Sequence, residues 1–411
     1  MSDRIPRTGR PALARRLTLP LTVLFGLGVT IGAGIYVLIG ATVGRAGMHA
    51  PLAFILAALV MAPTAASFAE FAARYPVSAG EAAYVEAGFG SKRLALVIGL
   101  MVIAVGIIAA AAISRGSAGY IREFVALPTD VIVPLVVLVM GTIAAWGIVQ
   151  SVVIAAAMTV IEIVGLLAII IVGVVQTPDL AARLPELWTG LSGLSVLSGA
   201  LGATLLAFFA FIGFEGLANI AEEVKEPERT LPKAIFLTLA ISTLFYVMVV
   251  WIALMTVPHG ELASATAPLS LVFNRITGAS PTAISAIAVI ATTNGIIAQI
   301  IMAARVMFGL ADRNLLPPVL AQISPRTQTP LIATGVVVVA VLVLASSFPL
   351  EGLAEMTSRL TLIIFTAVNG ALVQFKRTVQ PMPEAAFTVP IFVPVVGFLL
   401  CVGLLLADIV G

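Results

Sequence analysis

Long apolar stretches separated by short polar connections repeat along the whole chain. Eleven of them are roughly 20 residues long, the length that a helix needs to cross the hydrocarbon layer of a bilayer. They lie at 19–44, 51–73, 94–114, 131–149, 152–176, 196–221, 234–257, 283–308, 331–348, 357–375 and 388–410. Their interiors lack the apolar and polar alternation of a membrane β-barrel, so helices are the predicted spanning elements.

Composition supports a membrane protein and argues against an enzyme. Of the 411 residues, 60% are hydrophobic and 10% charged, against roughly 25% charged in a soluble domain. The single cysteine, Cys401, excludes an internal disulfide and a cysteine-based metal cluster. His49 and His259 stand in connections without a second ligand nearby, and no Ser/His/Asp set or HExxH motif occurs. We therefore expect no metal, no enzymatic activity and no nucleic-acid partner.

The distribution of lysine and arginine predicts the orientation in the membrane. With eleven spans, the connections on the side of the N-terminus carry 16 of the 22 basic residues, and the opposite side carries 6. Because basic residues collect on the cytoplasmic side, the N-terminus is predicted to be cytoplasmic. The C-terminus, at Gly411, is then external. The expected location is the inner or plasma membrane, with lipid as the surrounding partner.

The first apolar stretch contains an unusual run of glycine, "GVTIGAGIYVLIG" at 28–40. Each glycine in a helix interior costs about 1 kcal/mol relative to alanine. The glycines either let neighbouring helices pack closely, as Gly28 and Gly32 could at i and i+4, or they interrupt the helix and free its backbone groups. A second segment, "FFAFIGFEGLANIAEEV" at 208–224, has a similar weak point 181 residues later. This match favours an interruption in both spans.

Two matched interruptions, five spans apart, predict an inverted-topology repeat. The expected organisation is a cytoplasmic tail at 1–18, a first repeat at 19–176, an external loop at 177–195, a second repeat at 196–377, and a linker with an additional span at 378–411. An interrupted helix exposes amides that attract a carboxylate and carbonyls that attract an ammonium group. A zwitterion is therefore the expected ligand.

Several motifs together resemble the amino acid–polyamine–organocation superfamily. They are "IGAGIY", "AFIGFEG", "AEEVKEPERTLPKAI", "AARVMFGLADRNLLP" and "FAEFAARYPVSAGEAAYV". The similarity covers residues 17–377 and lies nearest to the cationic amino acid transporters and their bacterial relatives. It implies an all-α, leucine-transporter-type fold of five plus five helices with helices one and six broken. It also implies alternating access and amino acid substrates.

The resemblance also implies roles for backbone groups at both interruptions. The amides of Gly32, Ala33 and Gly34 would hold the substrate carboxylate. The carbonyls of Thr30, Phe209 and Ile212 would hold its ammonium group. Phe209 and Phe211 would close over the substrate as an aromatic gate, with ordinary core packing as the alternative.

Two glutamates are predicted inside the bilayer, where an ionisable group costs at least about 2.5 kcal/mol. Glu162 stands in the fifth span, where relatives often have a lysine that takes up the transported proton. We interpret it as the proton carrier, or else as a hydrogen-bonding partner of the first helix. Glu215, in "GFEG", could accept a proton, bias a gate or cap freed amides. Glu70 is expected to pair with a basic group.

The predicted function is secondary active, proton-coupled uptake of L-amino acids, driven by the proton motive force and without a cofactor. The alternatives are an exchanger, a carrier of polyamines or other amines, and a sensor that binds amino acids without moving them. No unpaired acid marks a pocket for a basic side chain, so cationic and small apolar amino acids both remain open as substrates. A monomer is compatible with this interpretation.

Overall fold

The computed structural model describes residues 15, 17–75, 80–146, 152–187, 194–378 and 386–410. The regular secondary structure of this part of the chain is helical, apart from an isolated parallel bridge between Leu17 and Val224. The α-helices are α1 (Leu19–Ala46), α2 (Ala50–Arg74), α3 (Gly80–Phe89), α4 (Lys92–Ile121), α5 (Thr129–Trp146), α6 (Val152–Gln176), α7 (Leu194–Phe211), α8 (Gly216–Asn219), α9 (Pro227–Thr256), α10 (His259–Ser264), α11 (Pro268–Thr277), α12 (Thr282–Asp312), α13 (Leu331–Ser347), α14 (Leu350–Thr378) and α15 (Phe392–Val410). Short 3-10 turns lie at Gly47–His49, Leu184–Leu187, Ala221–Glu223 and Pro318–Ala321.

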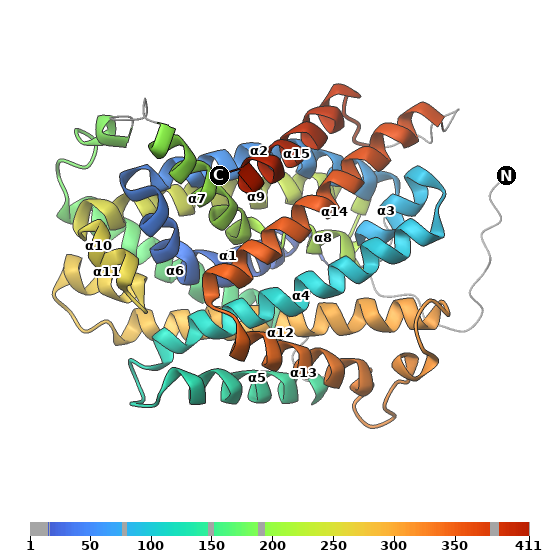
Figure 1. Ribbon diagram of the computed structural model, residues 1–411, viewed down its shortest axis with the longest axis horizontal. Helices are drawn as coiled ribbons and strands as arrows, with labels where there is room; N and C mark the ends of the chain where they lie inside the picture. The colour runs from blue at the N-terminus through green and yellow to red at the C-terminus, as the bar shows by residue number, and fades with distance from the viewer. Residues whose placement is uncertain are drawn as a thin grey trace.

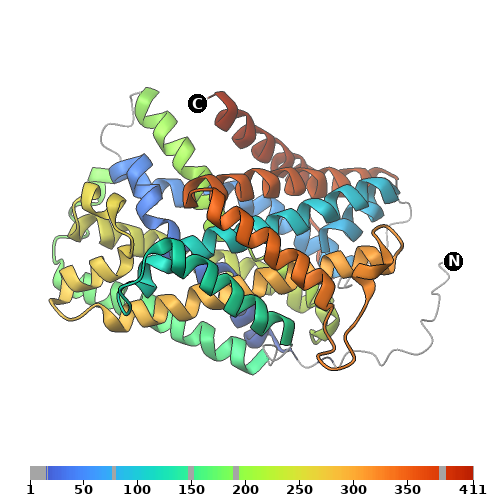
Figure 2. The same cartoon turned by 60° about the horizontal axis from the view of Figure 1, so that its bottom comes forward.

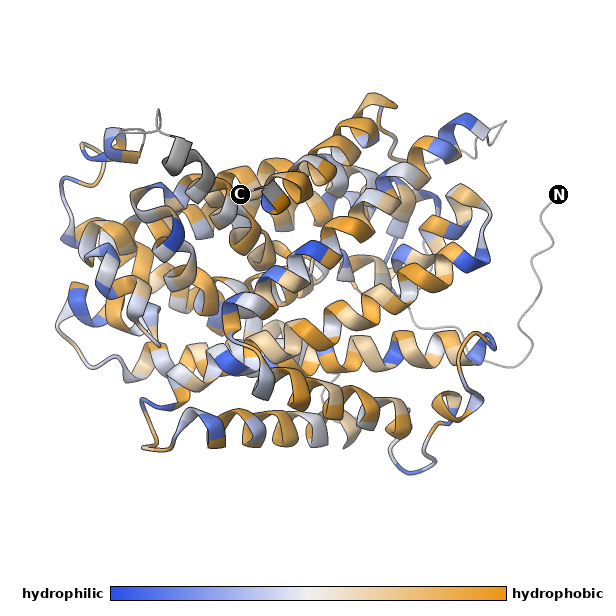
Figure 3. Cartoon of the chain, in the orientation of Figure 1, coloured by the Kyte–Doolittle hydropathy of each residue, from blue (hydrophilic) through white to orange (hydrophobic). Residues whose placement is uncertain are grey.

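Ten of the eleven predicted spans each overlap one long helix, and the sixth, 196–221, covers α7 and α8. The long helices are mostly hydrophobic over their length (Figure 3). Nine stretches in the described part of the chain are long and apolar enough to cross a membrane. Two shorter apolar helical stretches are Leu19–Gly32, the first part of α1, and Leu331–Ser347, which is α13. The protein is therefore an all-helical, multi-pass membrane protein, while the number of crossings stays a prediction.

The helices of the two predicted halves are interleaved (Figure 1). The first four predicted spans, α1, α2, α4 and α5, pack against α7, α9, α12 and α13 respectively. These are the pairs that the predicted repeat would relate, although the repeat itself stays a prediction. The short helices α10 and α11 lie at one end of the bundle and α3 at the other (Figure 1). The last helix, α15, packs on α14 and α2 at the edge of the bundle (Figure 2).

The predicted interruption of the first span is wrong for this conformation, because α1 is one helix from Leu19 to Ala46. Its glycines serve close packing instead. A Cβ atom on Gly34 would lie 2.3 Å from the Cα of Ala210 in α7. One on Gly28 would lie 2.1 Å from Oγ1 of Thr159 in α6. Side chains at these positions would separate the helices, which explains why glycine is present despite its low helix propensity.

The predicted interruption of the sixth span is confirmed, since α7 ends at Phe211 and α8 begins at Gly216. Gly213 has φ 135°, a conformation that side chains rarely adopt. A Cβ atom there would also lie 2.9 Å from the carbonyl oxygen of Val29 in α1. The chain therefore turns at Gly213 because only glycine fits both the backbone conformation and the neighbouring helix.

A buried ionic cluster around Glu70 links α2 and α14 to the segment before the last helix. It confirms the expected pairing of Glu70 with a basic group. The fully buried carboxylate of Glu70 in α2 accepts hydrogen bonds from Nε of Arg74 at 2.9 Å and Nζ of Lys376 in α14 at 2.7 Å. It also accepts one from the amide of Val389, before α15, at 2.8 Å. Three donors satisfy this carboxylate, as a buried charge requires.

Candidate functional site

A small cavity of about 20 Å³ lies where the end of α7 passes α1. Two further helices, α4 and α12, complete its wall. The lining residues are Val29, Thr30 and Gly34 of α1, Ala109 and Ile113 of α4, Phe209 and Ile212 at the end of α7, and Gly295, Ala298 and Gln299 of α12. Largely apolar walls with a few polar groups are typical of a small-molecule site.

The cavity brings together four of the residues that the sequence predicts for substrate binding: Thr30, Gly34, Phe209 and Ile212. They come from two segments about 180 residues apart that meet because α1 packs against α7. No donor in the described residues reaches the carbonyl of Ile212, which lies in the break after α7. Gly32 does not line the cavity, and the side chain of Ala33 lies outside the described residues.

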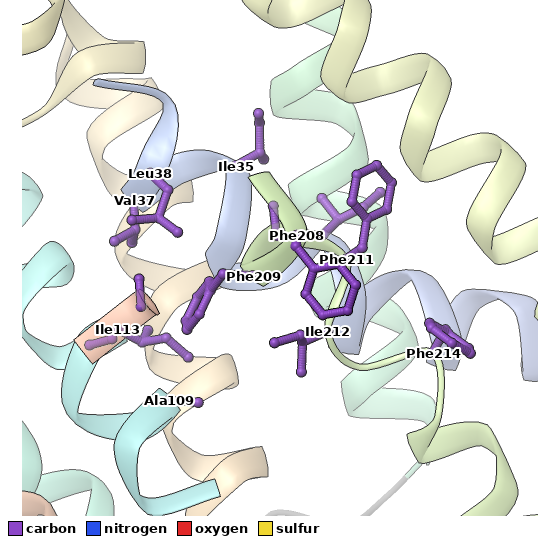
Figure 4. Close-up of a cluster of buried hydrophobic side chains, with 14 of the residues drawn as sticks. Ile35, Val37, Leu38, Ala109, Ile113, Phe208, Phe209, Phe211, Ile212 and Phe214 are labelled. Atoms are coloured by element: carbon purple, nitrogen blue, oxygen red, sulfur yellow. The ribbon is translucent and has the colours of Figure 1, made fainter. Parts of the chain in front are cut away.

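The two phenylalanines proposed as a gate have different surroundings. Phe209 points toward Ala109 and Ile113 of α4 and lines the cavity (Figure 4). Phe211 points away from them (Figure 4) and is fully buried against Tyr246, with ring centroids 4.9 Å apart. The geometry is thus compatible with a gating role for Phe209 and with core packing for Phe211.

Tyr246 of α9 is a residue at this site that sequence reasoning missed. Its buried hydroxyl lies 2.8 Å from both the carbonyl oxygen of Thr30 and that of Ala210, and donates between them. It therefore bridges α1 and α7 beside the cavity. A tyrosine within an apolar span is a weak signal, because belt residues at the membrane surface have the same appearance in a sequence.

Two oxygen atoms at the cavity lack hydrogen-bond partners. They are Oγ1 of Thr30 and Oε1 of Gln299, both buried. An unsatisfied buried polar atom costs about 1–3 kcal/mol, so such atoms are rare unless a ligand or water supplies the partner. Both residues line the cavity. A ligand with hydrogen-bond donors would therefore satisfy them.

Glu162 of α6 lies on another face of α1, away from the cavity. Its carboxyl oxygen Oε1 accepts a hydrogen bond from Nδ2 of Asn294 in α12 at 3.3 Å, whereas Oε2 has no partner. Oε2 would be 3.4 Å from a Cβ atom on Gly32. The hydroxyl of Tyr36 in α1 donates to the backbone carbonyl of Glu162 at 2.9 Å. This fully buried carboxyl thus faces the glycine-rich turn of α1, as a partner of that helix would.

Glu215 lines a second cavity, of about 10 Å³, which shares no lining residue with the first. Its Oε2 accepts a hydrogen bond from the amide of Gly213 at 2.8 Å, so it caps the break in the sixth span. Glu81 of α3 and Thr361 of α14 line the same cavity, and Oγ1 of Thr361 has no partner. Burial raises the pKa of Glu81 to about 7.

Apolar helices around a small cavity, with buried carboxyl groups nearby, are compatible with a membrane transporter. The comparisons with known proteins agree. The amino acid permease family matches residues 17–410. The chain belongs to this family of the amino acid–polyamine–organocation superfamily, near the cationic amino acid transporter branch, which confirms the resemblance found in the sequence.

The individual relatives differ in the substrates that their names state. The chain is 30% identical to the branched-chain amino acid permease BcaP of Bacillus subtilis, over 97% of this chain and 89% of that protein. It is 30% identical to the vacuolar cationic amino acid transporter 4 of Arabidopsis thaliana, over 89% of this chain and 64% of that protein. It is 28% identical to the methylthioribose transporter of Bacillus subtilis, over 94% of this chain and 86% of that protein.

Proposed function

We propose that the protein is a secondary active transporter that takes up L-amino acids together with protons by alternating access across the cell membrane. One observation supports the proposal. Four predicted binding residues from the two glycine-containing motifs line one cavity between α1 and α7; they are Thr30, Gly34, Phe209 and Ile212. In the proposed complex, the carbonyl oxygens of Thr30, Phe209 and Ile212 accept hydrogen bonds from the substrate ammonium group.

The substrate carboxylate is proposed to bind the amides of Gly32, Ala33 and Gly34. These amides lie within the continuous helix α1 in this conformation, so binding requires the helix to open locally. The glycines lower the cost of that opening, because each contributes about 1 kcal/mol less helix stability than alanine. Amides freed in this way carry partial positive charge toward the carboxylate.

Glu162 is proposed to carry the coupled proton. Its unpaired Oε2 faces the backbone of α1 at Gly32. Protonation of this carboxyl would therefore affect the turn of α1 that is proposed to open. A protonated carboxyl costs much less to bury without a partner than a carboxylate does. Loss of the proton would therefore favour a different arrangement of α1. Glu215 is a second candidate, since it caps the other break and shares a cavity with Glu81.

Transport in liposomes tests the proposal. The purified protein is reconstituted, and labelled amino acids are supplied outside vesicles with an alkaline interior. We expect accumulation above equilibrium that disappears when a protonophore removes the gradient. Binding without flux would indicate a sensor, flux that requires an amino acid inside would indicate an exchanger, and flux of amines alone would indicate an amine carrier.

The variant Glu162→Gln tests the proton carrier separately. We expect it to exchange labelled for unlabelled substrate but not to accumulate substrate in response to the pH gradient. Glu261→Gln is the matched control, because Glu261 in α10 is exposed and pairs with exposed Arg275. If Glu162→Gln kept gradient-driven accumulation with an unchanged pH profile, Glu162 would not be the proton carrier.

A further inference from the structure

The cavity has no group that could neutralise a charged substrate side chain. None of its ten lining residues is ionisable, and its polar side chains are those of Thr30 and Gln299. Burying an ammonium, guanidinium or carboxylate group without an opposite charge is strongly unfavourable. A ligand bound here can therefore carry charge only where backbone groups of α1 and of the break after α7 receive it.

The carboxyl groups nearby do not alter this conclusion. Glu162 does not line the cavity and faces Gly32 on another side of α1. Glu215 lines the second cavity, and one of its oxygens is already bonded to the amide of Gly213. Neither carboxylate therefore belongs to the wall that a substrate side chain in the first cavity would contact.

The position of Gln299 makes it the group that faces the substrate side chain. Substrate backbone groups are proposed to bind α1 and the end of α7, so the side chain extends toward α4 and α12. There it meets Ala109 and Ile113 on one helix and Gly295 and Ala298 on the other. Gln299 is the polar residue on these two walls, and its Oε1 is buried without a partner.

We propose that this cavity selects amino acids with uncharged side chains and that Gln299 determines this selectivity. The proposal rests on the amino acid transport proposed above. Gln299 is uncharged and close in shape to glutamate, so replacing it by glutamate places one carboxylate in the wall at little change in volume. That carboxylate would pair with a basic side chain and would exclude an acidic one.

Ligand-dependent thermal stability of the purified full-length protein tests the selectivity directly. The panel contains L-alanine, L-valine, L-leucine and L-threonine, then L-lysine, L-arginine and L-glutamate, and finally putrescine and methylthioribose. A ligand that binds the folded state raises its melting temperature. We expect a response to uncharged amino acids and at least a tenfold weaker affinity for the charged ones.

The variant Gln299→Glu tests the assigned residue. We expect L-lysine and L-arginine to gain at least tenfold in affinity relative to L-leucine. Gln322→Glu is the matched control, because Gln322 is exposed outside the cavity, and it should keep the original order. An unchanged order in Gln299→Glu would refute the role of Gln299. If this variant does not fold, the panel with the unaltered protein still decides the selectivity.

The outcomes separate this inference from the function on which it rests. Equal or preferential binding of lysine or arginine by the unaltered protein would overturn the selectivity and leave amino acid transport intact. A response only to putrescine or methylthioribose, which lack an α-amino acid group, would overturn the proposed function and the selectivity with it. A response confined to uncharged amino acids would support both.

Discussion

Replacement of Gly34 by alanine tests whether close approach of α1 and α7 shapes the site. The added Cβ atom would lie 2.3 Å from Cα, 2.7 Å from Cβ and 3.0 Å from the carbonyl oxygen of Ala210. Ordinary contacts begin near 3.4 Å, so the two helices must separate by about 1 Å. Because most of these atoms belong to the backbone, no side-chain rotation can relieve the overlap.

The expected loss of stability follows from two opposing effects. Overpacking of a closely packed interior costs about 1–3 kcal/mol, and contact with backbone places Gly34→Ala at the upper end of this range. Alanine restores about 1 kcal/mol of helix propensity. The net expectation is a destabilisation of about 2 kcal/mol. Since Gly34 lines the cavity, separating the helices should also weaken substrate binding.

Gly335→Ala in α13 is the matched control. A Cβ atom at Gly335 meets nothing within 4 Å, so the substitution should stabilise the protein by up to about 1 kcal/mol. The assay is the melting temperature in detergent, followed by uptake into liposomes. We expect the melting temperature to fall for Gly34→Ala and to stay or rise for Gly335→Ala. Equal shifts, or normal uptake by Gly34→Ala, would refute the packing argument.

Two further predictions concern Glu81 and Tyr246. Burial raises the pKa of Glu81 from 4.5 to about 7. At a pH between these two values the folded state keeps a proton that the unfolded chain releases. The free energy of unfolding therefore falls by roughly 3 kcal/mol as the pH rises through this range. Glu81→Gln should flatten this decline in melting temperatures measured from pH 5 to 8; an unchanged decline would contradict the assignment. Tyr246→Phe should cost about 1–2 kcal/mol and raise KM for uptake, because the carbonyls of Thr30 and Ala210 lose their shared donor. The control Tyr75→Phe, at the end of α2, should change neither property, and equal effects of both variants would show that the bridge is unimportant.

The sequence was sufficient to predict the helices and the break in the sixth span, because both depend on local properties. A run of about 20 apolar residues is enough to predict a spanning helix, and Gly213 marks the turn that only glycine accommodates. The glycines of α1 were harder to interpret. Interruption and close packing require the same residue, and the choice between them depends on Ala210 and Thr159, which lie far away in the sequence.

The sequence predicts the part of the candidate site that lies in the glycine motifs of α1 and α7. It does not predict the part that side chains from other helices contribute. Thr30, Gly34, Phe209 and Ile212 were identified because they flank the two glycine motifs. Gln299 stands on α12, and no local pattern distinguishes it from a polar residue packed elsewhere in the bundle. Its importance follows only from its position on the cavity wall.

The separation of ionisable groups from the cavity lining suggests how the proposed selectivity and the proposed proton coupling can be combined in one fold. Glu162 faces the backbone of α1, and Glu215 caps the break after α7; neither lines the first cavity. Changes in their protonation would act on the segments that are proposed to bind the substrate backbone, which all amino acids share. Residues on α4 and α12 can then vary to fit different side chains without altering the coupling. Relatives named for branched-chain and cationic amino acids are compatible with such a division. This division of roles predicts that Gln299→Glu changes the preferred substrate and leaves the pH dependence of uptake unaltered.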